Sequence, residues 1–539
     1  MRKFSFVFLI TVGLSLMLCL ACGETTTDNT EDGDTDSVGT DGDATDGDIV
    51  SDGDSDGDST VEDGDEDGDV SEAEQEIIAD GDADQGESEA DAEVEPTPIL
   101  PIAACNMTPY DLLPRQDVGK ALAFEKDSIF DISAETLGSM IPNDYKFLTP
   151  FDYGVRVYRL RYTTQDKGKL VEATSFVAFP ANSWTEDETK PDFPVALVLH
   201  GTTGYADSCA PTHPDNMLIG PAYAAIVASQ GYIAVAPDYI GLNGFGEGST
   251  TTHGYTVGEQ LAIGNWDALR ATEELMQKQE FKQEVKADGK YVIWGASQGG
   301  HAALFTELYG PYYAPEFEIT AIVADVAPIV MLPLAVMGVE TSNPTSAGLG
   351  AILVTNRAWY GAPEDLSEVF TNEEPYYFAD NLEENIFFEG TCSEQPNMPP
   401  RDFDLTSMYT EDFKQKVLAE NWDAIEPFSC YMREGSLVSS SVPPLRFTPT
   451  LMVYSEDDDL VVTGPMREGF DQLCEDGYQM EYLECANAGH SDGALWSLPE
   501  QFEWLRLRLE GVPVDSSKIC NRGEPVCCSA TPEGRCDEK

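Results

Sequence analysis

The sequence has 539 residues, of which 42% are hydrophobic, so the chain can build one large folded core. It contains 98 acidic and 30 basic residues, and its formal net charge is −68. Such a charge repels nucleic acids and anionic membrane surfaces, and it therefore excludes both as binding partners. A surface of this kind keeps a chain soluble and is also typical of salt-adapted proteins.

Residues 1–21 have the pattern of an export signal. Two basic residues precede the almost wholly apolar run Phe4–Leu20, which is short for a membrane-spanning helix. The run ends in Cys19-Leu20-Ala21-Cys22, which resembles a bacterial lipobox with Cys19 in the place of the usual leucine. The resemblance implies lipidation of Cys22 and a position at the bacterial cell surface or outer membrane. Ordinary cleavage and secretion of a free protein is the alternative.

Residues 22–100 form a low-complexity segment. Asp-Gly-Asp units such as Asp52-Gly53-Asp54 recur, and neither Lys nor Arg occurs between Glu24 and Pro114. Charge repulsion and the scarcity of apolar residues predict an extended, disordered tether. Calcium binding is the alternative, because the repeats supply carboxylates at ligand spacing, but the flanking apolar helices of an EF-hand are missing from the sequence.

Residues 101–520 have the pattern of a single α/β domain. Strand-like runs lie at Val155–Tyr162, Leu170–Phe179, Val195–Leu199, Tyr232–Ala236, Tyr291–Trp294, Ile319–Ala324 and Leu451–Tyr454. Helix-like segments such as Asn265–Gln279 and Gly299–Tyr309 alternate with them. This alternation predicts a mostly parallel central sheet with helices on both faces.

Two regions depart from this alternation. Residues 331–444 are rich in aromatic, proline and acidic residues and contain no convincing buried strand, so we expect an inserted helical cap. Residues 521–539 form a cysteine-rich tail. Ten cysteines follow Cys22, an even number in an exported chain, which favours disulfide bonds whose pairing the sequence does not reveal.

The main chemical motif is Gly295-Ala296-Ser297-Gln298-Gly299, a G-x-S-x-G pattern. An apolar strand precedes it and a helix follows, which is the setting in which a serine projects from a tight strand-to-helix turn. We therefore predict Ser297 as the nucleophile. The alternative is a glycine-rich turn with a capping serine.

A second loop, His200-Gly201-Thr202-Thr203-Gly204, directly follows another buried strand. Acyl transfer requires two N–H donors that already point at the developing oxyanion. We predict the backbone N–H groups of Gln298 and Thr202 for this role, with Thr203 as the alternative to Thr202. An ordinary glycine turn is the alternative for the loop as a whole.

The base must be a histidine downstream of the serine. His301 follows the serine too closely to face it, which leaves His490 in a loop of small residues after the strand-like run Gln479–Leu483. An acid must lie between serine and histidine, and three aspartates follow the strand that ends at Tyr454. Asp458 is preferred, with Asp459 next and Asp457 last. The order serine, aspartate, histidine is that of α/β-hydrolases.

These motifs together resemble the secretory lipase family. The resemblance extends from about Phe176 to Cys520 and includes the His200–Gly204 loop, the run Gly231–Leu242 and the serine motif. It implies an α/β-hydrolase fold, hydrolysis of acyl esters, and a helical cap ahead of the acid strand. It also favours Asp458 as the acid.

The resemblance also has departures, which leave the substrate open. Ala296 stands where the family often has a bulkier residue, and the acid loop lacks the usual proline after Val462. Phe387, Phe388 and Trp422 of the cap either line an acyl pocket or form the core of the cap.

The expected function is an extracellular carboxylic-ester hydrolase. We expect it to act as a monomer on a small acyl ester or lipid, to meet a membrane only through its anchor, and to need no cofactor or metal. A serine peptidase or polyester hydrolase on the same fold is one alternative. A catalytically inert surface interaction protein is the other.

Overall fold

The computed structural model describes residues 100, 105–125, 128–181, 191–217, 220–278, 281, 285–381 and 403–536. The predicted signal peptide, Cys22 and the predicted tether up to residue 99 lie outside this part of the chain, as do Phe387 and Phe388. Within it, every helix is too short or too polar to cross a membrane.

A mixed sheet runs through the described chain in the order β1-β3-β4-β6-β5-β7-β8-β9-β10, and β2 pairs with β3. Neighbours from β6 to β10 are parallel, whereas β1, β2, β3 and β4 pair antiparallel. The prediction of a mostly parallel sheet is therefore confirmed. The strands are β1 (Ala121–Phe124), β2 (Phe130–Ile132), β3 (Gly154–Asp166), β4 (Lys169–Ala181), β5 (Asp192–Leu199), β6 (Ile233–Pro237), β7 (Lys286–Ala296), β8 (Ile319–Asp325), β9 (Thr450–Ser455) and β10 (Met480–Cys485).

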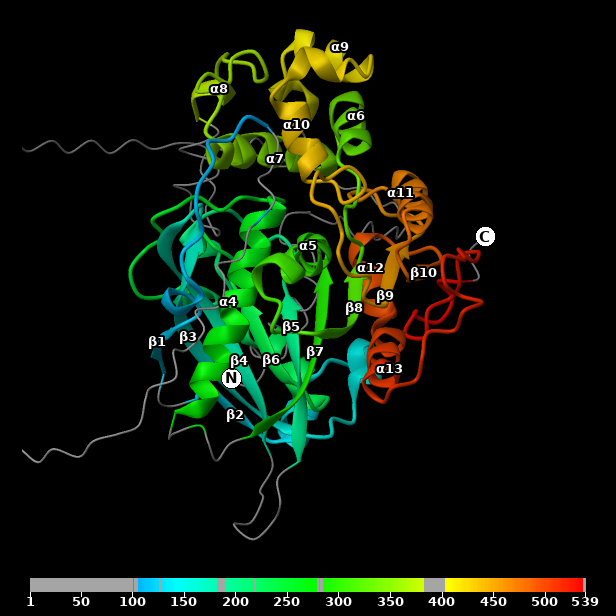
Figure 1. The fold of residues 1–539 in the computed structure, drawn as a ribbon. Helices are drawn as coiled ribbons and strands as arrows, with labels where there is room; N and C mark the ends of the chain where they lie inside the picture. The colour runs from blue at the N-terminus through cyan, green and yellow to red at the C-terminus, as the bar shows by residue number, and fades with distance from the viewer. Residues whose placement is uncertain are drawn as a thin grey trace, which may run out of the picture. The chain divides into compact units, whose positions relative to one another are not determined.

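Helices cover both faces of this sheet because alternate strand residues point to opposite sides. Leu197 and Leu199 of β5 pack with the helices α4 and α5, which lie in front of the sheet in Figure 1. Ala196 and Val198 pack on the other face with α3 and α13. The helices outside the cap are α2 (Ala134–Met140), α3 (Gly220–Ser229), α4 (Gly258–Gln277), α5 (Gln298–Tyr313), α11 (Thr463–Glu475), α12 (His490–Trp496) and α13 (Leu498–Leu509).

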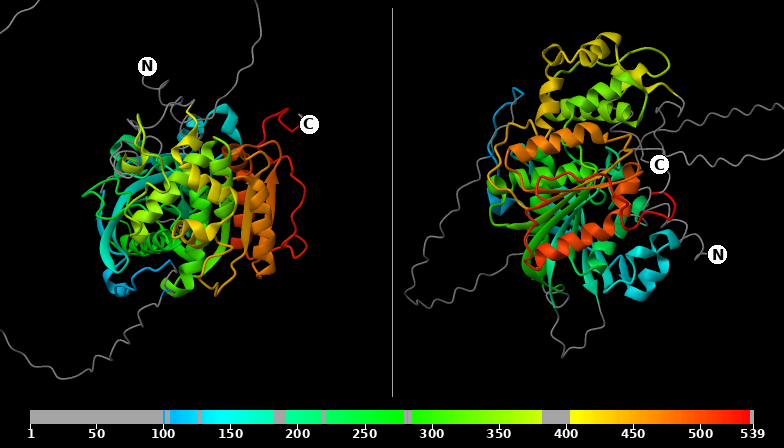
Figure 2. Two further views of the ribbon diagram at one scale, coloured as in Figure 1. Left: turned by 90° about the horizontal axis from the view of Figure 1, so that it is seen from above. Right: turned by 90° about the vertical axis from the view of Figure 1, so that its right-hand side faces the viewer.

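The described residues between β8 and β9 form helices and loops but no strand, and they stand above one end of the sheet (Figures 1 and 2). Trp422 is partly buried and packs against the hydrophobic core, which favours a place in the core of the cap. The cap helices are α6 (Leu332–Glu340), α7 (Pro344–Tyr360), α8 (Phe378–Asn381), α9 (Glu411–Leu418) and α10 (Phe428–Glu434).

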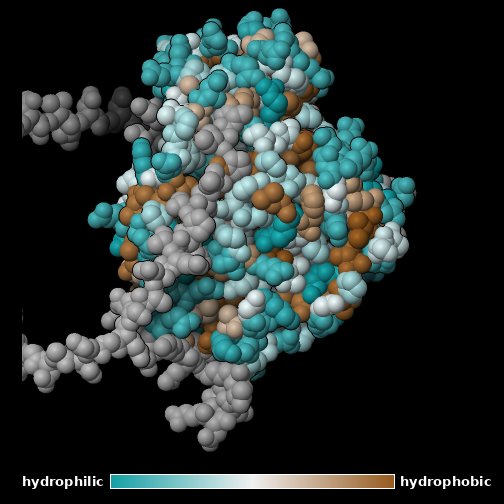
Figure 3. Space-filling model, in the orientation of Figure 1, coloured by the Kyte–Doolittle hydropathy of each residue, from teal (hydrophilic) through white to brown (hydrophobic). Residues whose placement is uncertain are grey.

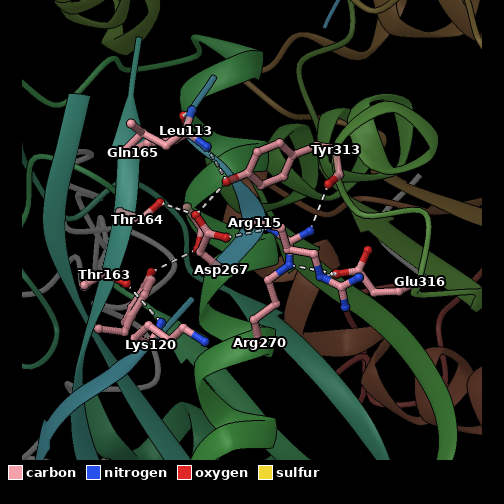
Figure 4. Close-up of polar contacts among 12 residues, drawn as sticks. Leu113, Arg115, Lys120, Thr163, Thr164, Gln165, Asp267, Arg270, Tyr313 and Glu316 are labelled. Atoms are coloured by element: carbon pink, nitrogen blue, oxygen red, sulfur yellow. Dashed lines mark hydrogen bonds and ion pairs between the residues drawn. The ribbon is translucent and has the colours of Figure 1, made fainter. Parts of the chain in front are cut away.

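The segment ahead of β1 is fastened both to the cap and to the main domain. A disulfide joins Cys105 to Cys430 of the cap helix α10. Further along, the Leu113 N–H donates to Gln165 of β3 at 2.7 Å, and Gln165 donates to the Tyr313 hydroxyl at 3.0 Å (Figure 4). This hydroxyl donates in turn to the buried carboxylate of Asp267 at 2.8 Å. The network thus connects the N-terminal segment with β3, α4 and α5.

The C-terminal tail closes the open edge of the sheet at β10. The Val526 N–H donates to the carbonyl of Glu484, and the Ala486 N–H donates to the carbonyl of Val526, each at 2.8 Å. Disulfides hold this segment, and they pair Cys474 with Cys520, Cys485 with Cys528, and Cys527 with Cys536. The tail therefore occupies backbone groups of β10 that an open edge strand would offer to another chain.

Candidate active site

Ser297 stands on a strained turn between β7 and α5. Its backbone has φ 57° and ψ −120°, an unfavourable conformation for a residue with a side chain. The Ser297 N–H donates to the carbonyl of Asp325 at 2.8 Å, which fixes the turn against β8. Glycines permit the close approach on either side: a Cβ on Gly295 would lie 2.2 Å from the carbonyl oxygen of Gly299. The turn therefore projects the hydroxyl beyond the end of the strand.

His490 lies between Ser297 and Asp458, and all three side chains are buried. Its Nε2 is 3.0 Å from the Ser297 Oγ, and its Nδ1 is 2.7 Å from Asp458 Oδ2. The other carboxylate oxygen of Asp458 accepts the N–H groups of Leu460 at 2.9 Å and Val461 at 2.8 Å. These bonds fix the carboxylate, which in turn holds the imidazole with Nδ1 protonated and Nε2 free to accept the serine proton.

Charges around His490 favour its protonated form. Burial lowers the pKa of His490, but the nearby carboxylates of Asp458, Asp325 and Asp459 outweigh it, so its pKa lies above the ordinary value. Asp325 is fully buried at the end of β8, and burial raises the pKa of its carboxyl to about 7. The site therefore stabilises the imidazolium that forms when His490 takes a proton.

The predicted oxyanion residues lie on two different elements. Gln298 begins α5, so its backbone N–H belongs to the free N–H groups of a helix N-terminus. Thr202 lies in the loop after β5, and its Oγ1 is 2.8 Å from the hydroxyl of Tyr255. His200 points elsewhere: its ring lies 4.3 Å from that of Tyr239, and its Nδ1 bonds the carbonyl of Gly201.

An apolar cavity of about 40 Å³ lies directly over Ser297. The cap contributes Leu334, Leu349 and Ile352 to its walls, and Leu460 closes it from the loop that carries Asp458. The cavity is therefore small and mostly apolar where it meets the serine. The arrangement offers a reacting group an apolar pocket between Ser297 and the cap.

The structure thus brings Ser297, Asp458 and His490 together, whereas Asp457 and Asp459 are exposed. His301 lies on α5, as expected, and its Nε2 bonds the carbonyl of Gly435 at 2.8 Å, away from the serine. In the described part of the chain, no group of three or more His, Cys, Asp or Glu side chains could hold a metal ion.

Sequence reasoning missed Asp325 and Tyr255. Asp325 could have been found, because it ends an apolar strand and functional sites of parallel sheets lie at the carboxyl ends of their strands. Tyr255 stands in a loop without a recognisable motif, and only the folded chain brings its hydroxyl to Thr202.

Comparisons with known proteins identify the family of the chain. The model of the secretory lipase family matches residues 212–517. Lipase 5 of Candida albicans is 25% identical over 294 residues, which cover 53% of this chain and 57% of that protein. Lipase A of Arthroderma benhamiae is 23% identical over 236 residues, which cover 43% and 46%. The chain thus spans only about half the length of these curated relatives.

Solved structures share the fold. The rice cell wall degrading esterase LipA from Xanthomonas oryzae, in a ligand-bound form, has a TM-score of 0.59 and 20% identity, covering 73% of this chain and 99% of that one. Candida antarctica lipase A in its closed state has a TM-score of 0.54 and 14% identity, covering 77% and 87%. These likenesses establish the α/β-hydrolase fold.

Proposed function

The chain belongs to the secretory lipase family, and from this membership and the geometry of its site we propose that it is an exported serine hydrolase of carboxylic esters. The observation that carries the proposal is the position of His490, within hydrogen-bond distance of both Ser297 Oγ and Asp458 Oδ2. A hydroxyl, an imidazole and a carboxylate in this order are the elements of acyl transfer through a covalent intermediate.

The proposed reaction has two halves. His490 Nε2 takes the Ser297 proton while Oγ attacks the ester carbonyl, and the N–H groups of Gln298 and Thr202 receive the oxyanion. The imidazolium then protonates the leaving alcohol. His490 then takes a proton from water as that water attacks the acyl-enzyme, and it returns the proton to Oγ as the bond between Oγ and the acyl carbon breaks, which releases the acid and Ser297. Asp458 holds the ring throughout and stabilises its positive charge.

The cavity supports a preference for short acyl chains. Its volume of about 40 Å³ is far below that of a long hydrocarbon chain. Its apolar walls suit an acyl group, because burial of each CH₂ contributes about 0.8 kcal/mol. We therefore expect a short acyl chain to be accepted more readily than a long one, which would need more space between Ser297 and the cap.

Hydrolysis of a p-nitrophenyl ester series tests the proposal, with wild type beside Ser297→Ala. We expect turnover by wild type, fastest on short chains, and a fall in kcat of about 10⁴-fold or more in the variant. Ser491→Ala is the matched control, a buried serine next to His490. A wild type no faster than Ser297→Ala on any chain length would contradict the proposal and favour the peptidase or interaction alternatives.

We also propose that Cys22 carries a lipid that holds the exported protein at a membrane. The support is the lipobox-like Cys19–Cys22 run and the membership of a secretory family. Cells fed an alkyne fatty acid should label wild type and Cys19→Ala, but not Cys22→Ala, because lipidation requires the thiol of the cysteine at the cleavage point. Equal labelling of Cys22→Ala would exclude the anchor.

A further inference from the structure

The loop between β6 and α4 contacts both predicted oxyanion residues. The loop contains His253-Gly254-Tyr255. The side-chain Nε2 of Gln298 lies 2.8 Å from His253 Nε2, and the hydroxyl of Tyr255 lies 2.8 Å from the Thr202 Oγ1. One tripeptide therefore holds one residue on α5 and another on the loop after β5.

His253 is a fixed acceptor for Gln298. Its Nδ1 lies 3.1 Å from the carbonyl oxygen of Ile240, which can only accept, so Nδ1 carries the proton and Nε2 accepts from the Gln298 amide. The imidazole is fully buried, and burial lowers the pKa of His253 to about 4. Its ring also stacks on that of Tyr239 at 5.9 Å. The neutral tautomer therefore persists at neutral pH.

Tyr255 connects the same loop to the cap. Its carbonyl accepts from the side-chain Nδ2 of Asn356 on α7 at 2.7 Å, and Asn356 is 1% exposed. Its ring meets that of Tyr205 edge-on at 5.2 Å and lines the cavity beside Ser297. Behind it, Gln260 of α4 donates to the carbonyl of Thr252 at 2.9 Å. The tripeptide is thus fixed from both the cap and the main domain.

We propose that His253 and Tyr255 are positioning residues that hold the two sides of the oxyanion hole, and that Asn356 couples their position to the cap. The inference rests on the proposed function. Oxyanion donors are effective only if they already point at the developing charge, so that no reorganisation is needed during the reaction. Removal of a donor costs about 10²–10³-fold in kcat. A donor that is present but less firmly positioned should lower kcat less, by about tenfold.

A double-mutant cycle tests the pair formed by Tyr255 and Thr202. Tyr255→Phe and Thr202→Val each remove one partner of the hydrogen bond and keep the shape of the side chain. We expect each to lower kcat on a p-nitrophenyl ester about tenfold with little change in KM. The double variant should lose about tenfold, not about a hundredfold, because both changes remove one interaction.

A transition-state analogue supplies a readout that a purely structural role would not move. An alkylboronic acid forms a bond between boron and Ser297 Oγ, whose proton passes to His490, and the tetrahedral anion occupies the oxyanion hole. Its affinity should fall by the same factor as kcat in Tyr255→Phe and in Asn356→Ala. Tyr312→Phe is the matched control, since this hydroxyl bonds the carbonyl of Pro443 instead.

The outcomes separate the two proposals. If wild type hydrolyses the ester and both Tyr255→Phe and Thr202→Val keep its kcat and its boronate affinity, the positioning role is wrong and the hydrolase remains. A hundredfold loss in the double variant would also overturn it, since the two residues would then act independently. Should wild type hydrolyse no ester, the proposed function itself fails. If Tyr255→Phe does not fold, Thr202→Val tests the same bond alone.

Discussion

Three consecutive aspartates follow β9, and the middle one alone is buried. The Asp458 carboxylate accepts two backbone N–H groups besides the His490 ring, so its position is fixed by the loop that bears it. The exposed carboxylates of Asp457 and Asp459 can be solvated by water. The different roles of these neighbours therefore follow from backbone geometry, and three consecutive aspartates in a sequence do not reveal them.

We predict that Asp458→Asn lowers kcat for ester hydrolysis by about 10⁴-fold, because an amide holds the imidazole in the wrong tautomer while leaving the site intact. Asp457→Asn and Asp459→Asn are matched controls and should stay close to wild type. Steady-state kinetics of the three variants decides the assignment. If Asp459→Asn suffered the large loss instead, the acid would be misassigned.

The pH dependence should also follow the carboxylates. Only neutral His490 acts as a base, so kcat/KM should rise with pH through its pKa, which lies above the ordinary value because the carboxylates outweigh burial. Asp325→Asn removes one of these charges and should move the acidic limb to lower pH. Burial raises the pKa of Asp325 itself to about 7, so the two groups titrate together. The acidic limb of the pH profile therefore reports His490 and Asp325 jointly. An unchanged limb in a pH profile of kcat/KM would show that Asp325 has no such influence.

At the scale of elements, the serine turn depends on how closely α5 approaches β5. A Cβ on Gly299 would lie 2.0 Å from the carbonyl oxygen of Leu199, and neither backbone can yield without separating the helix from the strand. Gly299→Ala should therefore lower the free energy of unfolding by about 3 kcal/mol. Gly464→Ala in α11 meets nothing within 4 Å and should be neutral or stabilising. Urea denaturation compares them, and equal stabilities would contradict the close approach.

The elements of the main domain could be predicted because their patterns are local. Buried strands such as β5 and β8 are continuous apolar runs, and the serine lies where a strand must turn into a helix. The arrangement within the cap and the contact of Tyr255 with Thr202 could not be predicted. Both depend on residues far apart in the sequence, and loops such as the one between β6 and α4 carry no periodicity. The same is true of disulfides such as Cys105–Cys430.

At the scale of the whole molecule, the hydrophilic outer surface and the apolar surface for the substrate lie in different places. The net charge is −68, and the face of the cap seen in Figure 3 is mostly hydrophilic, with hydrophobic residues in small separate patches. The apolar surface that would receive an acyl group lies inside, between the cap and Ser297. An acidic exterior repels anionic surfaces, whereas the pocket at Ser297 is lined by apolar side chains.

The disulfide between Cys105 and Cys430 has a mechanical consequence. Any pull on the chain ahead of Cys105 arrives at a residue with two covalent continuations, one toward β1 and one through sulfur into α10. Part of the load therefore enters the cap directly, without passing through the sheet. Tension on the leading segment would therefore act on the cap beside Ser297 as well as on the strands of the sheet.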